Sequence, residues 1–354
     1  MKSQRGIYCA LAFLFYSLAT DANAREAACL LTSPNERLSN YCIIQNGLWE
    51  DITEADLKVI DLRLKSAGYV DGLGLDLETD PKLTSFYVAP SLEYSTDING
   101  GNPDRPLDLG PFRFRLQDEF IRKEGLLVGL GVGASHRELF GPSRYVDFGA
   151  QASYAHSPKH DIGVQTLIAG TCANVSLQEN WFTESCASGQ QIERDLSEDE
   201  VAALSVRFGR LFTVGNQQHN EATVGLQRYF AENYSQSQLL LGWETIYRNG
   251  VFVSLNGTLG EPINQNLATR RAIKAKVGVF LKDRPVNLSL GIAEADGGSL
   301  LGLPINEDIY AIELRVPITP RFTAVAGYRW VESNNDFFDQ SVPSLGIEIT
   351  PFRL

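Results

Sequence analysis

The sequence is poor in the features that helical membrane proteins, metalloenzymes and nucleic-acid-binding proteins carry. Beyond an apolar run near its start, no stretch approaches the roughly 18 apolar residues that a membrane-spanning helix needs. The chain has one Met and four His, and its five Cys form no Cys-x-x-Cys pair. A formal net charge of -12 argues against nucleic acid as a partner. With 44% hydrophobic residues, the chain is also not a disordered one.

The first 24 residues have the organisation of a secretory signal peptide. Lys2 and Arg5 precede an apolar run over residues 7–19, and a small-x-small cleavage pattern follows at residues 22–24. A transmembrane anchor is the alternative, but the apolar run is too short for one. We therefore expect a signal peptide over 1–24, a periplasmic segment over 25–82, and the main domain over 83–354.

The cysteines that follow the signal peptide are Cys29, Cys42, Cys172 and Cys186. Their order along the chain suggests that Cys29 pairs with Cys42 and Cys172 with Cys186, although four cysteines allow three connectivities. An even number fits an oxidising envelope compartment. Metal binding is the alternative, but neither the spacing nor a nearby His supports it. We expect disulfides, with the second one tying a loop, and neither a metal nor a cofactor.

The segment before residue 83 contains one helical pattern. In "DITEADLKVIDLRLKSAG", Leu57, Ile60 and Leu64 recur at helical spacing, Thr53 stands at the N-cap position, and Gly68 follows the last turn. The pattern predicts one amphipathic helix. It is either a small periplasmic appendage, a plug, or an element that docks a partner.

From residue 83 onward, the chain divides into fourteen strand-length segments of alternating polarity. They cover residues 83–94, 111–120, 125–134, 144–154, 159–169, 201–212, 220–231, 237–247, 250–259, 271–281, 285–294, 308–317, 321–331 and 342–352. The tight connections are 122–125, 156–159, 248–250, 282–285 and 319–321, and the long ones are 95–110, 170–200, 260–270, 295–307 and 332–341.

Long and tight connections alternate along the chain between the two ends of the predicted strands. If the chain enters the first strand from the periplasm, every long connection lies outside the cell and every tight one lies in the periplasm. Short periplasmic turns and long external loops are typical of outer-membrane barrels. We therefore predict an all-β fold in the cell outer membrane: a transmembrane up-and-down antiparallel β-barrel of about fourteen strands, preceded by a short helical segment.

The two faces of these segments differ in polarity. One face is apolar, as in Val128, Leu130 and Val132, and suits lipid. The other carries more ionised groups than a buried soluble core accepts, whereas a watery lumen accepts them. The predicted lumen-lining residues are Glu93, Arg113, Arg115, Asp147, Gln151, Arg207, Glu244, Lys274, Lys276, Glu313, Arg315, Arg329 and Glu348. Bases outnumber acids only slightly, which predicts weak ion selectivity.

The ending "SVPSLGIEITPFRL" resembles the C-terminal strand signal by which outer-membrane barrels are recognised for assembly. Ser344, Gly346 and Ile349 match its polar, glycine and apolar positions. Pro351 stands where the final aromatic residue belongs, and Phe352 comes one place later. The resemblance implies the barrel assembly machinery, outer-membrane lipid and lipopolysaccharide as partners.

Two further segments, "APSLEYSTDINGG" (89–101) and "YRWVESNNDFFDQ" (328–340), resemble the barrel domain of surface-lipoprotein assembly modulators. That resemblance implies a surface lipoprotein as cargo. Members of that family carry an N-terminal tetratricopeptide domain, for which residues 25–82 are too few.

One stretch could suggest a catalytic site. "YAHSPKHD" places His156 beside Ser157 with Asp161 nearby, but adjacent strand residues point to opposite sides. We predict no enzyme. The primary interpretation is a channel for passive or substrate-preferring passage of small hydrophilic solutes. The alternatives are a barrel that exports or assembles surface proteins, and a closed structural barrel.

Overall fold

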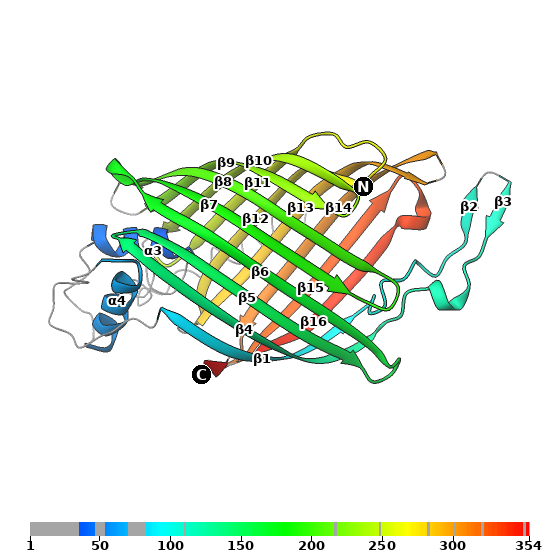
Figure 1. Cartoon of the computed structure of the whole chain (residues 1–354), viewed down its shortest axis with the longest axis horizontal. Helices are drawn as coiled ribbons and strands as arrows, with labels where there is room; N and C mark the ends of the chain where they lie inside the picture. Colours follow the sequence, from blue (N-terminus) through cyan, green and yellow to red (C-terminus); the bar gives the residue numbers. More distant parts are fainter. Residues whose placement is uncertain are drawn as a thin grey trace.

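The computed structural model describes residues 35–46, 54–69, 83–109, 111–215, 218–247, 249–281, 284–300, 302–319, 322–349 and 352–353. Most of these residues form one closed antiparallel barrel of fourteen wall strands (Figure 1). Consecutive wall strands are hydrogen-bonded neighbours, and the last pairs with the first. The predicted up-and-down β-barrel is confirmed.

The wall strands are β1 (Thr84–Ser95), β4 (Gly125–Gly141), β5 (Arg144–Ser157), β6 (Ile162–Ser176), β7 (Trp181–Glu193), β8 (Glu198–Val214), β9 (Gln218–Ala231), β10 (Tyr234–Tyr247), β11 (Phe252–Gly260), β12 (Ala268–Leu281), β13 (Arg284–Leu300), β14 (Leu303–Pro317), β15 (Phe322–Ser333) and β16 (Gln340–Ile349). A two-residue strand, β17 (Phe352–Arg353), also pairs with β1 after β16 has ended.

Side-chain alternation gives the wall an apolar outer face. Val128, Leu130 and Val132 of β4 are 49%, 52% and 50% exposed, and Leu226 of β9 is 68% exposed. Large apolar side chains at such exposure suit contact with lipid and not with water. The residues between them point inward.

The predicted strand over 111–120 is wrong. Only Phe112–Phe114 is a strand there (β3), and it pairs with β2 (Leu107–Leu109) in a hairpin that projects from the barrel (Figure 1). Arg113 lies on this hairpin and Arg115 follows it, so neither belongs to the barrel wall. Alternating polarity shows only that a strand has two different faces, and it does not identify the strand's partner.

The predicted loop over 170–200 is also wrong. It contains a wall strand, which makes up for the strand wrongly predicted over 111–120. Strand β6 continues to Ser176, and β7 occupies Trp181–Glu193. The face of β7 opposite to Glu184 includes Ser185, Ala187 and Gly189, whose side chains are small. The apolar half of the alternation is therefore weak, and the segment has the composition of a loop.

The barrel has two different ends. We call the end with the 142–143 turn the helix end, since both helices lie there, and the opposite end the far end (Figure 1). The long connections 96–124, 261–267 and 334–339 all lie at the far end. The tight segments 122–125 and 156–159 lie there too, contrary to prediction. Counting 111–120 as a wall strand assigned every connection between that segment and β7 to the wrong end of the barrel.

Two helices precede the barrel. Helix α4 (Glu54–Ser66) is the predicted one, and the chain leaves it through Gly68 at a φ of 88°. Helix α3 (Glu36–Asn46) was not predicted. Neither of these described helices is long and apolar enough to span a membrane. The predicted signal peptide, Cys29 and Thr53 lie outside the described residues.

Candidate functional site

Helix α3 begins with a side-chain cap. The Asn35 side-chain oxygen accepts a hydrogen bond from the Leu38 backbone N–H at 3.1 Å, and its amide nitrogen donates to Glu244 on β10 at 2.8 Å. Leu38, Tyr41 and Cys42 follow at helical spacing and are all buried. This cap and spacing were visible in the sequence and could have identified the helix.

The apolar face of α3 packs against inward-facing side chains of the wall. One buried cluster consists of Leu38, Tyr41, Cys42 and Ile43 of α3, Ile60 and Leu64 of α4, and Phe182, Leu211, Ile246 and Phe252 of the wall. At its edge, the Tyr41 and Thr213 hydroxyls are 3.3 Å apart. Helix α3 is therefore docked inside the barrel mouth at the helix end.

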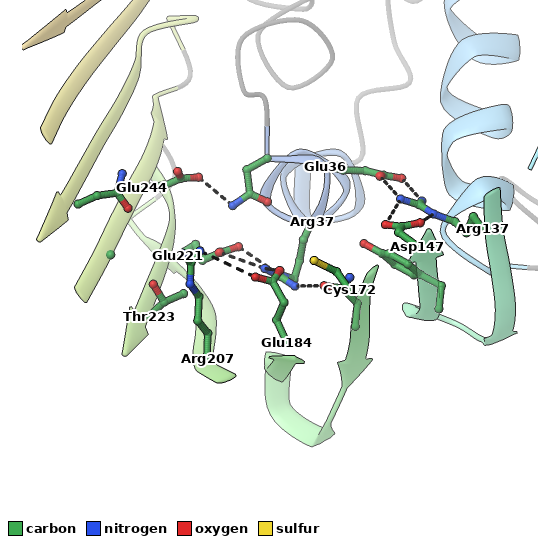
Figure 2. A pocket seen from close by; sticks show the side chains of 15 residues that line it. Glu36, Arg37, Arg137, Asp147, Cys172, Glu184, Arg207, Glu221, Thr223 and Glu244 are labelled. Carbon is green, nitrogen blue, oxygen red and sulfur yellow. Dashed lines mark hydrogen bonds and ion pairs between the residues drawn. The ribbon is translucent and has the colours of Figure 1, made fainter. Parts of the chain in front are cut away.

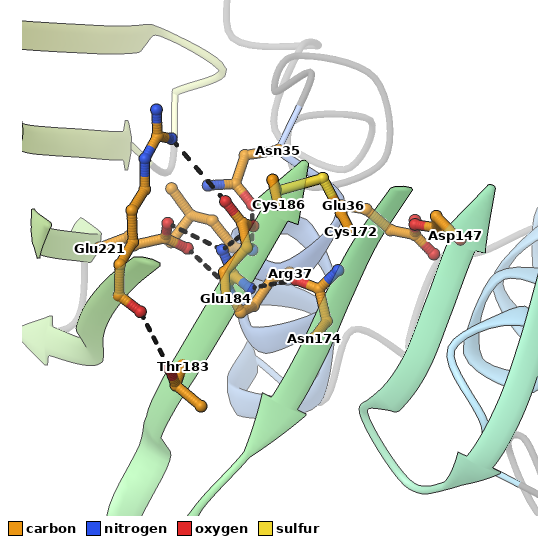
Figure 3. Close-up of polar contacts among 12 residues, drawn as sticks. Asn35, Glu36, Arg37, Asp147, Cys172, Asn174, Thr183, Glu184, Cys186 and Glu221 are labelled. Atoms are coloured by element: carbon orange, nitrogen blue, oxygen red, sulfur yellow. Dashed lines mark hydrogen bonds and ion pairs between the residues drawn. A yellow bond between two sulfur atoms is a disulfide. The ribbon is translucent and has the colours of Figure 1, made fainter. Parts of the chain in front are cut away.

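Arg37 binds the wall through its whole guanidinium group (Figure 3). Nε lies 3.2 Å from Glu221, Nη2 lies 3.3 Å from Glu184, and Nη1 donates to the Asn174 side-chain oxygen at 2.9 Å. The guanidinium carbon lies 3.5 Å from the centre of the Phe182 ring. Burial alone would lower the pKa of Arg37, but the Glu221 and Glu184 carboxylates raise it above its ordinary value, so Arg37 stays charged.

A second arginine, Arg137 of β4, binds α3 from the opposite direction (Figure 2). It contacts Asp147 of β5 through Nε at 2.6 Å and Glu36 of α3 through Nη1 at 2.9 Å. Its Nη1 also donates to the Ser66 carbonyl at the end of α4, and its guanidinium carbon lies 3.9 Å from the Tyr145 ring centre. Arg137 therefore joins both helices to the wall.

The end of α4 docks on the turn between β4 and β5. The Ser143 backbone N–H donates to the Ala67 carbonyl at 2.8 Å, and the Ser143 hydroxyl donates to the Tyr69 hydroxyl at 2.8 Å. Gly68 approaches the Gly141 carbonyl so closely that a side chain at this position would collide with it. These contacts hold α4 against the rim of the mouth.

A cavity of about 300 Å³ remains between α3 and the wall (Figure 2). Three predicted lumen residues, Asp147, Arg207 and Glu244, line it. Glu244 accepts hydrogen bonds from Asn35 and from the Ser254 hydroxyl. The structure therefore brings these three together with α3, which the sequence did not predict.

Cys172 and Cys186 form a disulfide, as their order suggested. Contrary to expectation it ties no loop, since the two residues face each other on the neighbouring wall strands β6 and β7. Cys172 lines the cavity beside α3 (Figure 3). Cys42 is also disulfide-bonded, and its predicted partner Cys29 lies outside the described residues.

The inward face continues around the rest of the barrel through cross-strand neighbours. From Glu244 the path runs through Ser254, Lys276, Ser289, Glu313, Gly327 and Ser344. By alternation, Glu93, Lys274, Arg315, Arg329 and Glu348 share this face. Gln151 faces the same way and accepts a hydrogen bond from Tyr87 at 3.0 Å.

This second part of the lumen differs from the first in its contacts. The contacts described for α3 go to strands β4 through β11. On β12 to β16 and β1, the inward residues Lys274, Arg329, Glu348 and Glu93 are exposed to solvent. Within the described ranges, Lys274 and Lys276 take part in no ion pair, whereas Arg315 contacts both Glu313 and Glu348. We call β12–β16 with β1 the open half of the lumen.

The described residues hold no group of three or more His, Cys, Asp or Glu side chains placed to bind a metal ion. His156 lies 3.6 Å from Asp161, and its neighbour Ser157 is buried on the opposite face of β5.

No protein-family model and no curated protein matches the chain. Among solved structures, it is similar to OccK2 (OpdF) of Pseudomonas aeruginosa at 8% identity and a TM-score of 0.43, over 77% of this chain and 98% of that one. It is similar to the outer membrane protein opdK of the same organism at 7% identity and 0.42, with the same coverage. The beta domain of the Bordetella autotransporter Brka gives 10% identity and 0.31, over 76% and 100%. Values this low carry no information on function.

Proposed function

We propose that the chain is an outer-membrane channel for small hydrophilic solutes, and that α3 closes its mouth at the helix end. The observation that supports this most is the division of the lumen. Helix α3 is fastened to β4–β11, while the open half presents exposed ionised groups such as Lys274 and Arg329. An apolar outer face around a charged, wet interior is what a lipid-embedded channel requires.

The strand number fits a channel that an inserted element can close. Eight-stranded barrels fill their interior with side chains, whereas sixteen-stranded porins leave an aqueous passage. A barrel of fourteen strands lies between these cases. It has room for a helix at the mouth and for water in the lumen beyond it.

The same proposal covers the surroundings of the barrel. We place the helix end in the periplasm, the far end outside the cell, and the apolar face against outer-membrane lipid and lipopolysaccharide. We expect insertion to depend on the barrel assembly machinery, as the C-terminal resemblance implies.

Conductance in planar bilayers tests the closure. Leu38 is fully buried against the wall, so Leu38→Asp should release α3 and raise the frequency of discrete conductance steps above that of the unaltered protein. The matched control is Ile44→Asp on the same helix, because Ile44 is 46% exposed. Heat-modifiable migration on gels verifies that both barrels are folded.

Two outcomes would contradict the proposal. If folded Leu38→Asp protein conducts no more than Ile44→Asp protein, α3 does not close the mouth. If neither variant nor a chain lacking residues 35–46 conducts, the channel proposal fails and a closed structural barrel explains the fold better.

A further inference from the structure

We propose that the wall site holding Arg37 is a binding site for solutes that carry a guanidinium group, and that such solutes open the channel by displacing α3. The inference rests on the proposed channel function. It assigns a ligand class to one place in the lumen and makes Arg37 a tethered occupant of that place.

The contacts of Arg37 match the specific features of a guanidinium. Two carboxylates and one amide oxygen accept from its three nitrogens, and Glu221 meets both Nε and Nη2, at 3.2 and 3.4 Å. The Phe182 ring covers the flat face of the group at 3.5 Å. An ammonium group is compact and cannot make the planar, forked set of bonds.

All four residues that contact the Arg37 guanidinium belong to the barrel wall and not to α3. Asn174 is on β6, Phe182 and Glu184 are on β7, and Glu221 is on β9. The Cys172–Cys186 disulfide joins β6 to β7 two residues from Asn174 on one strand and two residues from Glu184 on the other. The site should therefore keep its shape when α3 leaves.

The charge of the site favours a cation. The side chains of Glu221 and Glu184 are only 5% and 20% exposed. Removing Arg37 would leave Glu184 with Arg207, 3.8 Å away, and would take from Glu221 its ion pair among the described residues. Glu184 and Glu221 both contact the same Arg37 nitrogen, so without Arg37 the two neighbouring carboxylates repel each other and favour a cation from solution at the vacated site.

The adjoining cavity of about 300 Å³ offers room for the remainder of a small ligand. It extends from the Arg37 site to Glu244 and Asn256, which add an acidic and an amide group. Because Arg37 is attached to the same chain, its effective concentration at the site is on the order of millimolar or above. The solute must also overcome the apolar cluster and the Arg137–Glu36 pair that hold α3, so displacement needs a concentration above that value.

Calorimetric titration of purified Arg37→Ala protein with ethylguanidinium tests the site. We expect saturable binding, and binding of propylammonium at least about tenfold weaker, since it has the same charge without the forked donors. Glu184→Gln in the Arg37→Ala background should weaken ethylguanidinium by at least about tenfold as well. The matched control is Arg271→Ala, because Arg271 is exposed on the outer face and paired with Glu294. Arg271→Ala protein should bind no more ethylguanidinium than the unaltered protein, because Arg37 still occupies the site.

Planar bilayers supply the second measurement. Ethylguanidinium should block the steps of Arg37→Ala channels and should raise the opening frequency of the unaltered protein, while propylammonium should do neither. The unaltered protein keeps the test decisive even if Arg37→Ala does not fold.

The outcomes separate the two proposals. Conduction by Arg37→Ala protein without ethylguanidinium binding or block would overturn the ligand site and leave the channel standing. Binding without conduction in any variant would overturn the channel and leave the site. Equal binding of the two cations would reduce the site to general attraction between charges and overturn the guanidinium assignment.

Discussion

At the scale of single residues, two arginines account for the position of α3. Arg37 reaches from α3 to the wall, Arg137 reaches from β4 to the helix, and each engages two carboxylates and an aromatic ring face. Because Arg37 has a raised pKa, its contribution is present throughout the physiological pH range and would be lost only at strongly alkaline pH. Deprotonation of Arg37 therefore does not release α3 from the wall.

The two faces of the wall can be separated by substitutions one residue apart. Leu226 of β9 is 68% exposed on the outer face, and Gln227 points inward beside Gln238. Leu226→Arg should cost about 2–4 kcal/mol of barrel stability near the membrane midplane, whereas Gln227→Arg should be tolerated in the wet lumen. Urea unfolding in lipid vesicles measures both. Equal losses would contradict the assignment of faces.

At the scale of elements, the helices belong to the barrel and do not form a separate domain. Both share one apolar cluster with wall strands, and α4 also docks on the β4–β5 turn. These contacts are what the proposed closure of the mouth by α3 requires.

Gly68→Ala should detach α4 from the rim. Gly68 has a φ of 88° and lies against the Gly141 carbonyl, so a Cβ would be both strained and obstructed. The matched control is Gly302→Ala, because Gly302 has a φ of 82° with open space around it. Both should lose about 1–2 kcal/mol to backbone strain, but only Gly68→Ala should expose α4 to hydrogen exchange and protease. The same exchange rate for α4 in both variants would refute the docking.

At the scale of the whole molecule, the proposed orientation puts the far end, which carries the long connections, outside the cell. A tag after Asn335 and a tag after Lys159 should both react with antibody on intact cells, and a tag at Asn249 should not. Lys159 is the informative position, because the sequence placed 156–159 in the periplasm and the structure places the 158–161 turn at the far end. Labelling of Asn249 alone would reverse the orientation.

The open half of the lumen should govern ion preference. Lys274, Lys276, Arg315 and Arg329 share its inward face with Glu93, Glu313 and Glu348, so the opened channel should discriminate only weakly between ions. Replacing both lysines with Glu should shift the reversal potential toward cation selectivity. Arg271→Glu is the control, since Arg271 is on the outer face of the same strand. An unchanged reversal potential in the double variant would place the ion path elsewhere.

The sequence by itself determined that the wall consists of strands with an apolar outer face and a polar inner face. A period of two residues is a local property, so the alternation of Val128, Leu130 and Val132 with small or polar residues predicted an outer and an inner face before any strand was placed. The count of fourteen wall strands agreed only because two errors cancelled: residues 111–120 were counted as wall and β7 was missed. The helical spacing of Leu57, Ile60 and Leu64 likewise predicted α4.

Only the tertiary structure decided which segments meet. The 111–120 segment alternates but pairs in an outer hairpin, while β7 alternates weakly and forms wall, because strand pairing depends on a partner distant in sequence. Cys172 and Cys186 became cross-strand neighbours for the same reason. The position of α3 depends on Glu184, Glu221 and Asp147 converging from three strands, and no local pattern records that convergence.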